Sequence, residues 1–328
     1  MPSLLAGLCP ALTQDVIVKL ESKGIKEVLD FVAIDPERIT AMCGIPYKKV
    51  MSIRRVLLAQ YSSFPVNGLD LFHETMGTLA VLPTGCESLD DLLDAGIYTG
   101  EVTEIVGPSS SGKTQLCETF AVNVAASFDQ NVIYIDTAGG FSAVRVGEIF
   151  KKRFSSHNTS ATLSRIRVSR CFEVSELRET LDLVRRKMSA QDETFFSSLK
   201  VVIIDSVTSL LSTVLYNGTF VEGMASLQSI GRQLNALAKD FALAVVITND
   251  MVTGPQDKTG QFSRKPALGR VWTFVPSVRV QLQPHIAPCL HHVGVNKILA
   301  RLTKSTRCGY RATSCVITSS GIESEKPS

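Results

Sequence analysis

Apolar and polar positions follow two different periods along most of the chain, and their order predicts the fold. Short apolar runs typical of buried strands are separated by segments with apolar residues at helical spacing. Such alternation is typical of an α/β domain with a doubly wound, mostly parallel sheet. The expected strands are 102–106, 131–136, 165–169, 200–205 and 243–248, and the expected helices are 114–126, 142–153, 173–188 and 222–240. The later segments 277–283, 297–303 and 311–318 predict further strands that extend the sheet, in antiparallel orientation.

Residues 1–60 have a different pattern, with short helical runs and tight joins. Helices are expected at 13–23 and 26–33, from Pro36, and at 47–60. Gly24-Ile25 and Gly44-Ile45 each join two helical pieces, which favours a small all-α N-terminal domain of helix-hairpin-helix type. Such a bundle can contact a DNA backbone or another protein, and it can equally be a packing module.

Residues 61–83 lack a clean period and are interrupted by prolines and glycines, so they are predicted to be a linker. Short apolar pieces within this linker are suited to docking on a neighbour. The core domain is expected at 84–318 and a flexible tail at 319–328.

Composition limits the class of protein. Hydrophobic residues make up 45% of the 328 positions, enough for a large core, and 20% are charged. No apolar stretch approaches the length that crosses a bilayer, and the N-terminus does not resemble a secretory signal. The eight cysteines include no C-x-x-C pair, which fits neither a zinc site nor a disulfide framework. We therefore expect a reduced intracellular setting and no membrane partner.

Positive charge is concentrated late in the chain. The formal net charge is only +3, but residues 258–311 contain ten Lys or Arg and no Asp or Glu. This asymmetry predicts a polyanionic partner for the C-terminal part of the core. The alternative is a solvated basic face without a ligand.

A complete G-x-x-x-x-G-K-[ST] phosphate-binding loop lies between a predicted strand and a predicted helix. It reads Gly107-Pro108-Ser109-Ser110-Ser111-Gly112-Lys113-Thr114. In such a loop backbone N–H groups surround a polyphosphate, the lysine reaches the β- and γ-phosphates, and the hydroxyl binds Mg²⁺. A Gly/Ser-rich turn with an incidental lysine is the alternative, but strand, loop and helix agree. The motif predicts a nucleoside triphosphate, ATP with Mg²⁺.

A candidate metal ligand follows the apolar run Val201-Val202-Ile203-Ile204. Asp205 ends this predicted strand, where an acid can hold Mg²⁺ directly or through water. A strand-end aspartate can also cap the next turn. Paired with the phosphate loop, Asp205 is predicted to be in the metal shell.

Several stretches of the chain carry a shared pattern. They are Thr84-Gly85-Cys86-Glu87-Ser88-Leu89-Asp90-Asp91-Leu92-Leu93 with Gly96, the phosphate loop with Gln115-Leu116-Cys117, Tyr134-Ile135-Asp136-Thr137, Val245-Val246-Ile247-Thr248-Asn249, Pro266-Ala267-Leu268-Gly269-Arg270-Val271-Trp272 and Phe274-Val275-Pro276-Ser277. Together they resemble the RecA/RadA recombinases over nearly the whole chain, which implies a RecA-like form of the predicted sheet. The C-terminal stretches are most similar to the recombinase paralogues, closest to the D-type branch of homologous-recombination repair, and the N-terminal domain resembles that of the eukaryotic members.

The resemblance also exposes a departure at the expected catalytic position. The family has Asp-Thr-Glu-Gly after the second strand, and its glutamate orients the attacking water, whereas this chain has Ala138 there. A methyl group cannot accept a proton, so we expect firm ATP binding with slow hydrolysis. Glu101, Glu104 or Asp136 could substitute, and a neighbouring protomer could complete the site.

Other site residues are implied by the same resemblance. Arg145 matches the spacing of an arginine that contacts the nucleotide base, although a surface arginine on an amphipathic helix is the alternative. Where the family has Asn-Gln after a later strand, this chain has Asn249-Asp250, so coupling of nucleotide to DNA is expected to be altered.

Two polar segments are expected to face nucleic acid as flexible loops, at 212–223 and 251–269. The DNA contacts implied for the second segment and the residue after it are Lys258, Arg264, Lys265 and Arg270. Unliganded flexible loops are the alternative.

These features lead to one hypothesis and two rivals. The resemblance implies a nuclear, ATP-binding accessory recombinase that acts in a hetero-oligomer with other paralogues, binds single-stranded or branched DNA, and supports recombinase filaments in double-strand break repair. The enzyme class stays open, at most a slow DNA-stimulated ATPase. The rivals are a self-sufficient DNA-dependent ATPase that performs strand exchange, and a scaffold that does not hydrolyse ATP.

Overall fold

The structure is a computed structural model that describes residues 4–62, 65–154, 159–190, 193–217, 220–256, 262–284 and 296–325. The chain divides into two compact units, Met1–Gly77 and Thr78–Ser328. Each unit contains its own cluster of buried apolar side chains, which is what allows it to be compact.

The N-terminal unit contains the four helices that the pattern predicts. They are α1 (Gln14–Glu21), α2 (Val28–Ala33), α3 (Pro36–Cys43) and α4 (Tyr47–Tyr61). Helix α3 shows why the boundaries are readable: the Asp35 side chain accepts a hydrogen bond from the Glu37 amide at 2.8 Å, and Gly44 ends the helix with φ of 61°. The core of this unit includes Leu20, Phe31, Ile39, Ile53 and Leu57, all fully buried.

The segment expected as a linker contains regular structure. Helix α5 (Gly68–Thr78) buries none of its residues, and β1 (Val81–Leu82) pairs antiparallel with β2 (Ile97–Tyr98). Helix α6 (Glu87–Leu92) lies between those two strands in the sequence. The boundary between the compact units, after Gly77, falls inside the expected linker.

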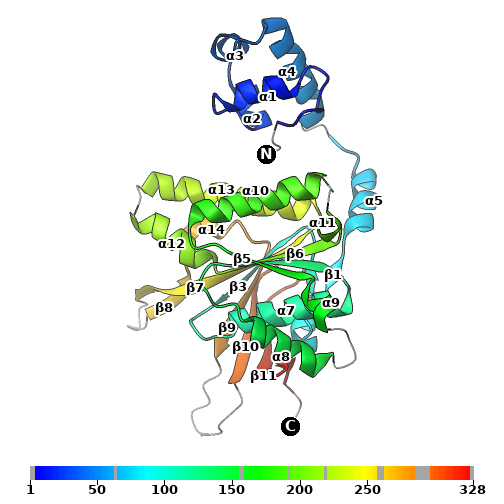
Figure 1. The fold of residues 1–328 in the computed structure, drawn as a ribbon. Coiled ribbons are helices and arrows are strands. Elements are labelled where there is room, and N and C mark those ends of the chain that lie inside the picture. The colour runs from blue at the N-terminus through cyan, green and yellow to red at the C-terminus, as the bar shows by residue number, and fades with distance from the viewer. Residues whose placement is uncertain are drawn as a thin grey trace. The chain divides into compact units, whose positions relative to one another are not determined.

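The described part of the larger unit contains a ten-stranded mixed sheet (Figure 1). Its order is β12-β11-β10-β9-β3-β7-β6-β4-β5, with β8 paired to β7. The strands from β9 through β3, β7, β6 and β4 to β5 are parallel to their neighbours, and β10, β11 and β12 continue in antiparallel order. The bounds are β3 (Val102–Gly107), β4 (Asn131–Asp136), β5 (Ile166–Arg170), β6 (Leu199–Asp205), β7 (Ala244–Gln256), β8 (Phe262–Pro266), β9 (Val278–Pro284), β10 (Asn296–Lys304), β11 (Arg311–Thr318) and β12 (Gly321–Ser324).

Helices cover both faces of the sheet, which confirms the doubly wound α/β class (Figure 1). Val201 and Ile203 of β6 pack into the apolar cluster with α7, whereas Val202 and Ile204 pack into the cluster with α10 and α13. A strand buried on both faces therefore has the continuous apolar run seen in the sequence. The covering helices are α7 (Lys113–Ser127), α8 (Ala143–Arg153), α9 (Thr159–Leu163), α10 (Val174–Ala190), α11 (Thr194–Ser197), α12 (Val207–Asn217), α13 (Phe220–Asp240) and α14 (Gly269–Trp272).

The expectation of a flexible tail from residue 319 is wrong for residues 321–324. These residues form β12, which pairs with β11, and Ile322 is buried. Two arginines of α8 also hold the β11–β12 turn: Arg145 donates to the carbonyls of Thr318 and Ser319, and Arg153 donates to the carbonyls of Ser320 and Ile322. Strand pairing and these charged donors order a segment whose sequence shows no periodicity.

The two expected flexible loops are also more regular than their sequences indicate. Residues 212–217 continue α12, and 220–223 begin α13. In the second segment β7 runs on to Gln256 and pairs with β8, with Met251 opposite Pro266 and Val252 opposite Lys265. In the second segment the reason is cross-strand pairing within one hairpin, which a local pattern interrupted by Gly254 and Pro255 hides.

Candidate nucleotide-binding site

The phosphate loop joins the end of β3 to the start of α7, as the motif requires. Gly112 precedes the helix with φ of 94°, and a Cβ atom there would lie 2.6 Å from Ile298 Cδ1. A Cβ atom on Gly107 would lie 2.8 Å from the backbone oxygen of Leu282. Both positions therefore need glycine to let the loop turn tightly against β9 and β10.

Lys113 is buried at the base of this loop and is held by three acceptors. Its Nζ donates to the carbonyls of Gly107 at 2.9 Å and Pro108 at 3.1 Å, and forms an ion pair with Asp250 Oδ1 at 2.8 Å. Its side chain is 10% exposed. The carbonyls of the phosphate loop thus help to fix the position of the Lys113 ammonium.

Asp205 lies where the sequence predicts, at the end of β6, with one strand between it and the phosphate loop strand. One carboxylate oxygen, Oδ2, accepts hydrogen bonds from Thr114 Oγ1 at 2.7 Å and from the Tyr134 hydroxyl at 2.8 Å. The other oxygen accepts from the Thr248 hydroxyl. Burial, followed by the nearby Cys117 and Asp205, raises the pKa of Tyr134 well above its usual range, so the phenol remains a donor.

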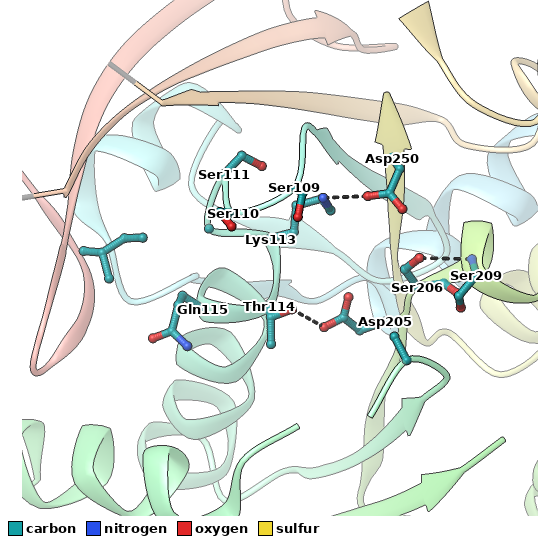
Figure 2. Close-up of a pocket in the computed structure, with 13 residues that line it drawn as sticks. Ser109, Ser110, Ser111, Lys113, Thr114, Gln115, Asp205, Ser206, Ser209 and Asp250 are labelled. Carbon is teal, nitrogen blue, oxygen red and sulfur yellow. Dashed lines mark hydrogen bonds and ion pairs between the residues drawn. The ribbon is translucent and has the colours of Figure 1, made fainter. Parts of the chain in front are cut away.

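Lys113, Thr114, Asp205 and Asp250 border one cavity of about 370 Å³ (Figure 2). Figure 2 shows Lys113 directed at Asp250 and Thr114 directed at Asp205 across this space. The lining residues are Ser109, Ser110, Ser111, Gly112, Lys113, Thr114, Gln115, Ala138, Asp205, Ser206, Ser209, Asp250 and Ile317. Of the predicted loop residues, Gly107 and Pro108 are not in this lining and instead hold Lys113 through their carbonyls.

The residues present fit a polyphosphate with Mg²⁺. The loop begins helix α7, so its amides and the helix dipole favour an anion, and Lys113 adds a cation. Thr114 and Asp205 are hydroxyl and carboxylate oxygens in direct contact, the oxygen donors that Mg²⁺ prefers. The buried hydroxyl of Ser111 has no hydrogen-bond partner among the described residues and lies in the cavity wall. A bound phosphate oxygen would satisfy it.

Ala138 lies in the cavity wall, so the position of the family's water-orienting acid carries only a methyl group. The suggested substitutes are engaged elsewhere. Asp136 accepts hydrogen bonds from the four successive backbone amides of residues 138–141. Glu104 is fully buried and bonded to Arg279, Asn249 and Trp272, and Glu101 is paired with Arg307.

Arg145 does not line the cavity in the described structure. Its Nε donates to Gln115 Oε1 at 2.8 Å, and its guanidinium also reaches the carbonyl of Ser319 at 2.9 Å. The described contacts are therefore those of a residue that joins α8 to α7 and to the β11–β12 turn. Contact with a nucleotide base stays a prediction.

Several lining residues were not singled out from the sequence. Ser206 and Ser209 follow Asp205 at the start of α12, a position that the strand-end aspartate could have indicated. Ile317 comes from β11, and no local signal connects it to a loop some two hundred residues earlier. Asp250 was noted only as a replacement of a family glutamine, and its contact with Lys113 was not foreseen.

Three of the four predicted DNA-contact residues are among the described residues, and none of these three lines the cavity. Arg264 and Lys265 are exposed on β8, and Arg270 is exposed on α14. Lys258 lies outside the described residues. Part of the basic surplus stabilises the fold instead, because Arg279, Lys297 and Arg307 form ion pairs with Glu104, Glu325 and Glu101.

The doubly wound sheet, the phosphate loop after β3 and the Thr114–Asp205 contact define a RecA-like nucleotide-binding protein. Residues 76–324 match the Rad51 family and residues 1–60 match the family described as RAD51D, N-terminal domain, so the chain belongs to the Rad51 family.

Named relatives agree with this assignment. The chain is similar to "DNA repair protein RAD51 homolog 4" of Bos taurus, with 47% identity over 283 residues that cover 86% of this chain and 85% of the relative. The Mus musculus protein of the same name is 44% identical over 308 residues, covering 94% and 92%. A more distant likeness is to "DNA repair and recombination protein RadA" of Cenarchaeum symbiosum (strain A), 28% identical over 88% of this chain and 71% of the relative.

Membership of the Rad51 family assigns this chain to DNA repair by homologous recombination. In the part of the chain that the structure describes, no helix has both the length and the apolar character needed to span a membrane.

Proposed function

We propose that this chain is an ATP-binding accessory recombinase subunit, which uses Mg²⁺-ATP as an assembly ligand more than as a fuel. The observation that carries the proposal is the combination in one cavity of a complete phosphate site and Ala138. Lys113 would hold the β- and γ-phosphates, and Thr114 and Asp205 would hold Mg²⁺. Bound Mg²⁺ would supply charge neutralisation of the phosphate oxygens.

The rate of hydrolysis depends on whether a carboxylate is available to position the attacking water. Asp136 and Glu104 accept from other donors, Glu101 is paired with Arg307 through one oxygen, and none of the three lines the cavity. The methyl of Ala138 cannot position a water. A ligand that binds only the assembled form stabilises that form by mass action without turnover. ATP bound near a protomer boundary would act in this way within a hetero-oligomer of recombinase paralogues in the nucleus.

The nucleotide part of the proposal is tested by measuring binding and turnover on the same protein. Equilibrium dialysis with labelled ATP and Mg²⁺ should show binding that Lys113→Ala abolishes. Phosphate release should stay slow with and without single-stranded DNA. Fast DNA-stimulated release by the isolated chain would instead support the self-sufficient ATPase.

Assembly is tested by native mass measurement of the chain with candidate paralogues, with and without ATP and Mg²⁺. The proposal expects complexes that form more tightly with nucleotide and are weakened by Lys113→Ala. Complexes that are equally stable with the wild-type chain and the variant would support the scaffold.

Single-stranded or branched DNA is the proposed polyanionic partner. The supporting feature is the β7–β8 hairpin, which starts at the cavity with Asp250 and presents exposed Arg264 and Lys265 opposite Thr253 and Val252. Charged side chains on such a hairpin can track a phosphate backbone without reading sequence.

The DNA contacts are tested by the double variant Arg264→Ala/Lys265→Ala. If both residues contact phosphates, the slope of log affinity against log salt for single-stranded DNA should fall by about 1.4, since each contact contributes about 0.7. Lys151→Ala/Lys152→Ala, which removes two exposed charges from α8, is the matched control. Equal losses from both double variants would contradict a hairpin-specific contact.

A further inference from the structure

Asp250 occupies the point where β7 leaves the nucleotide cavity and continues as the β7–β8 hairpin. Its Oδ1 atom lies 2.8 Å from Lys113 Nζ, and a dashed line in Figure 2 marks this ion pair. The Asp250 side chain is 44% exposed, whereas that of Lys113 is 10% exposed. The carboxylate therefore covers the open side of a buried ammonium.

The backbone of Asp250 is fixed on both sides. Its amide donates to Thr208 Oγ1 at 2.9 Å, and its carbonyl accepts from the Ala267 amide at 2.8 Å. The next residue, Met251, is already paired with Pro266 in the hairpin. Because the backbone is held in this way, the carboxylate can leave Lys113 only by rotation of its side chain.

The hydrogen-bonding capacity of Lys113 decides what an incoming phosphate must do. A lysine ammonium has three N–H donors. Here Gly107 O, Pro108 O and Asp250 Oδ1 supply three acceptors from the protein itself. Two of the three are backbone carbonyls of the loop, and the third belongs to a side chain that can rotate. A β- or γ-phosphate oxygen can therefore reach Lys113 only in exchange, and Asp250 is the acceptor that can give way.

We propose that Asp250 is a built-in competitor of the phosphate tail, a counter-ion that holds Lys113 and lowers the affinity of the site for nucleoside di- and triphosphates. This inference rests on the proposed nucleotide site and specifies what limits its affinity. When a phosphate displaces Asp250 from Lys113, the ion pair is lost and the carboxylate is left beside a polyanion. Both effects oppose nucleotide binding. A nucleoside monophosphate has no β- or γ-phosphate and does not compete for Lys113.

The test compares the full chain with Asp250→Asn, which keeps the shape of the side chain and removes its charge. Dissociation constants for ATP and ADP are measured by equilibrium dialysis at fixed Mg²⁺, and that for AMP by competition. Asp250→Asn should bind ATP and ADP about tenfold more tightly and AMP within about twofold of wild type. Asp129→Asn, which removes an ion-paired carboxylate at a site 80% exposed next to Arg165, should change none of the three.

A second measurement does not depend on the loaded protein. Without nucleotide, Asp250→Asn should melt at a lower temperature than wild type, because the buried Lys113 loses its counter-ion. Addition of saturating ATP should then raise the melting temperature of the variant more than that of wild type.

The outcomes separate this inference from the proposed function. If wild type binds ATP and Asp250→Asn binds it no more tightly, only the competitor role is overturned. Unchanged affinity with loss of ATP turnover overturns it too and assigns Asp250 to the attacking water. Binding by Asp250→Asn but not by wild type supports the competitor role, and binding by neither overturns both.

Discussion

The guanidinium of Arg279 on β9 donates to the fully buried carboxylate of Glu104 on β3. This pair lies where the parallel part of the sheet meets the strands that continue it in antiparallel order. Glu104 also accepts from Asn249 Nδ2 at 2.7 Å and from Trp272 Nε1 at 3.1 Å. One buried carboxylate thus connects three strands and α14.

Arg279→Ala is expected to destabilise the core unit by about 3–5 kcal/mol, because removal of one partner leaves an uncompensated buried charge. Denaturant unfolding followed by circular dichroism measures the change. Arg165→Ala, which breaks the exposed pair with Asp129, should cost about 1 kcal/mol or less. Similar losses in the two variants would show that the Glu104 charge is compensated by its other donors.

Gly107→Ala is expected to destabilise the core by about 1–3 kcal/mol and to weaken nucleotide binding, because the added methyl meets the Leu282 carbonyl. Gly147→Ala, in the interior of α8 with nothing within 4 Å of an added Cβ, should stabilise by about 0.5–1 kcal/mol. Thermal unfolding and ATP dialysis of both variants check the pair. Wild-type ATP affinity in Gly107→Ala would contradict the close approach of loop and strand.

Because of Glu118, the free energy of unfolding of the core unit is expected to fall as the pH rises through mildly acidic values. Burial, opposed by the Ser142 amide and Arg145, raises the pKa of Glu118 from its ordinary 4.5 to about 7. Between these values the unfolded chain has lost a proton that the folded chain keeps, so stability falls from about pH 4.5 to pH 7 and is level above.

Glu118→Gln should remove this dependence. The free energy of unfolding of the variant minus that of wild type should rise by on the order of 2 kcal/mol between pH 4.5 and pH 7.5. Denaturant unfolding at several pH values measures this difference. Glu179→Gln, an exposed substitution on α10, controls for loss of a negative charge. A constant difference between Glu118→Gln and wild type across this range would contradict the prediction.

Arg145→Ala is expected to destabilise the core by about 1–3 kcal/mol, since it deprives Thr318 O, Ser319 O and Gln115 Oε1 of a charged donor. Lys152→Ala, exposed on the same helix, is the control. Stability measured without nucleotide decides the structural role, and unchanged stability would contradict it. A separate fall in ATP affinity of the folded variant would support the base contact predicted from the sequence.

The central parallel strands β3, β4 and β6 were predictable because they are buried on both faces. Val201 through Ile204 must be apolar to contact both apolar clusters, so the strand appears as an uninterrupted run. Strand β12 gives no such signal, because it has four residues of which two are polar. Its existence depends on pairing with β11 and on the arginines of α8, which are non-local contacts.

The features of the candidate site likewise divide into those that the sequence predicted and those that it did not. The loop and Asp205 were found because phosphate binding demands a fixed local spacing and a strand-end acid. The engagement of Asp136 by four amides and of Lys113 by Asp250 could not be inferred, because both depend on how turns and separate strands meet in space. Chemistry confined to one motif is readable from the sequence, whereas competition between distant charges is not.

The buried position of Trp272 beside Glu104 gives this protein its own optical reporter. Trp272 is the sole tryptophan of the chain and is 1% exposed within the larger unit. Its indole emission should therefore follow the opening of the β3–β9 region without any added label, while melting of the helices in residues 4–62 leaves that emission unchanged. Comparison of emission with helical signal can separate the unfolding of the two units in the intact chain.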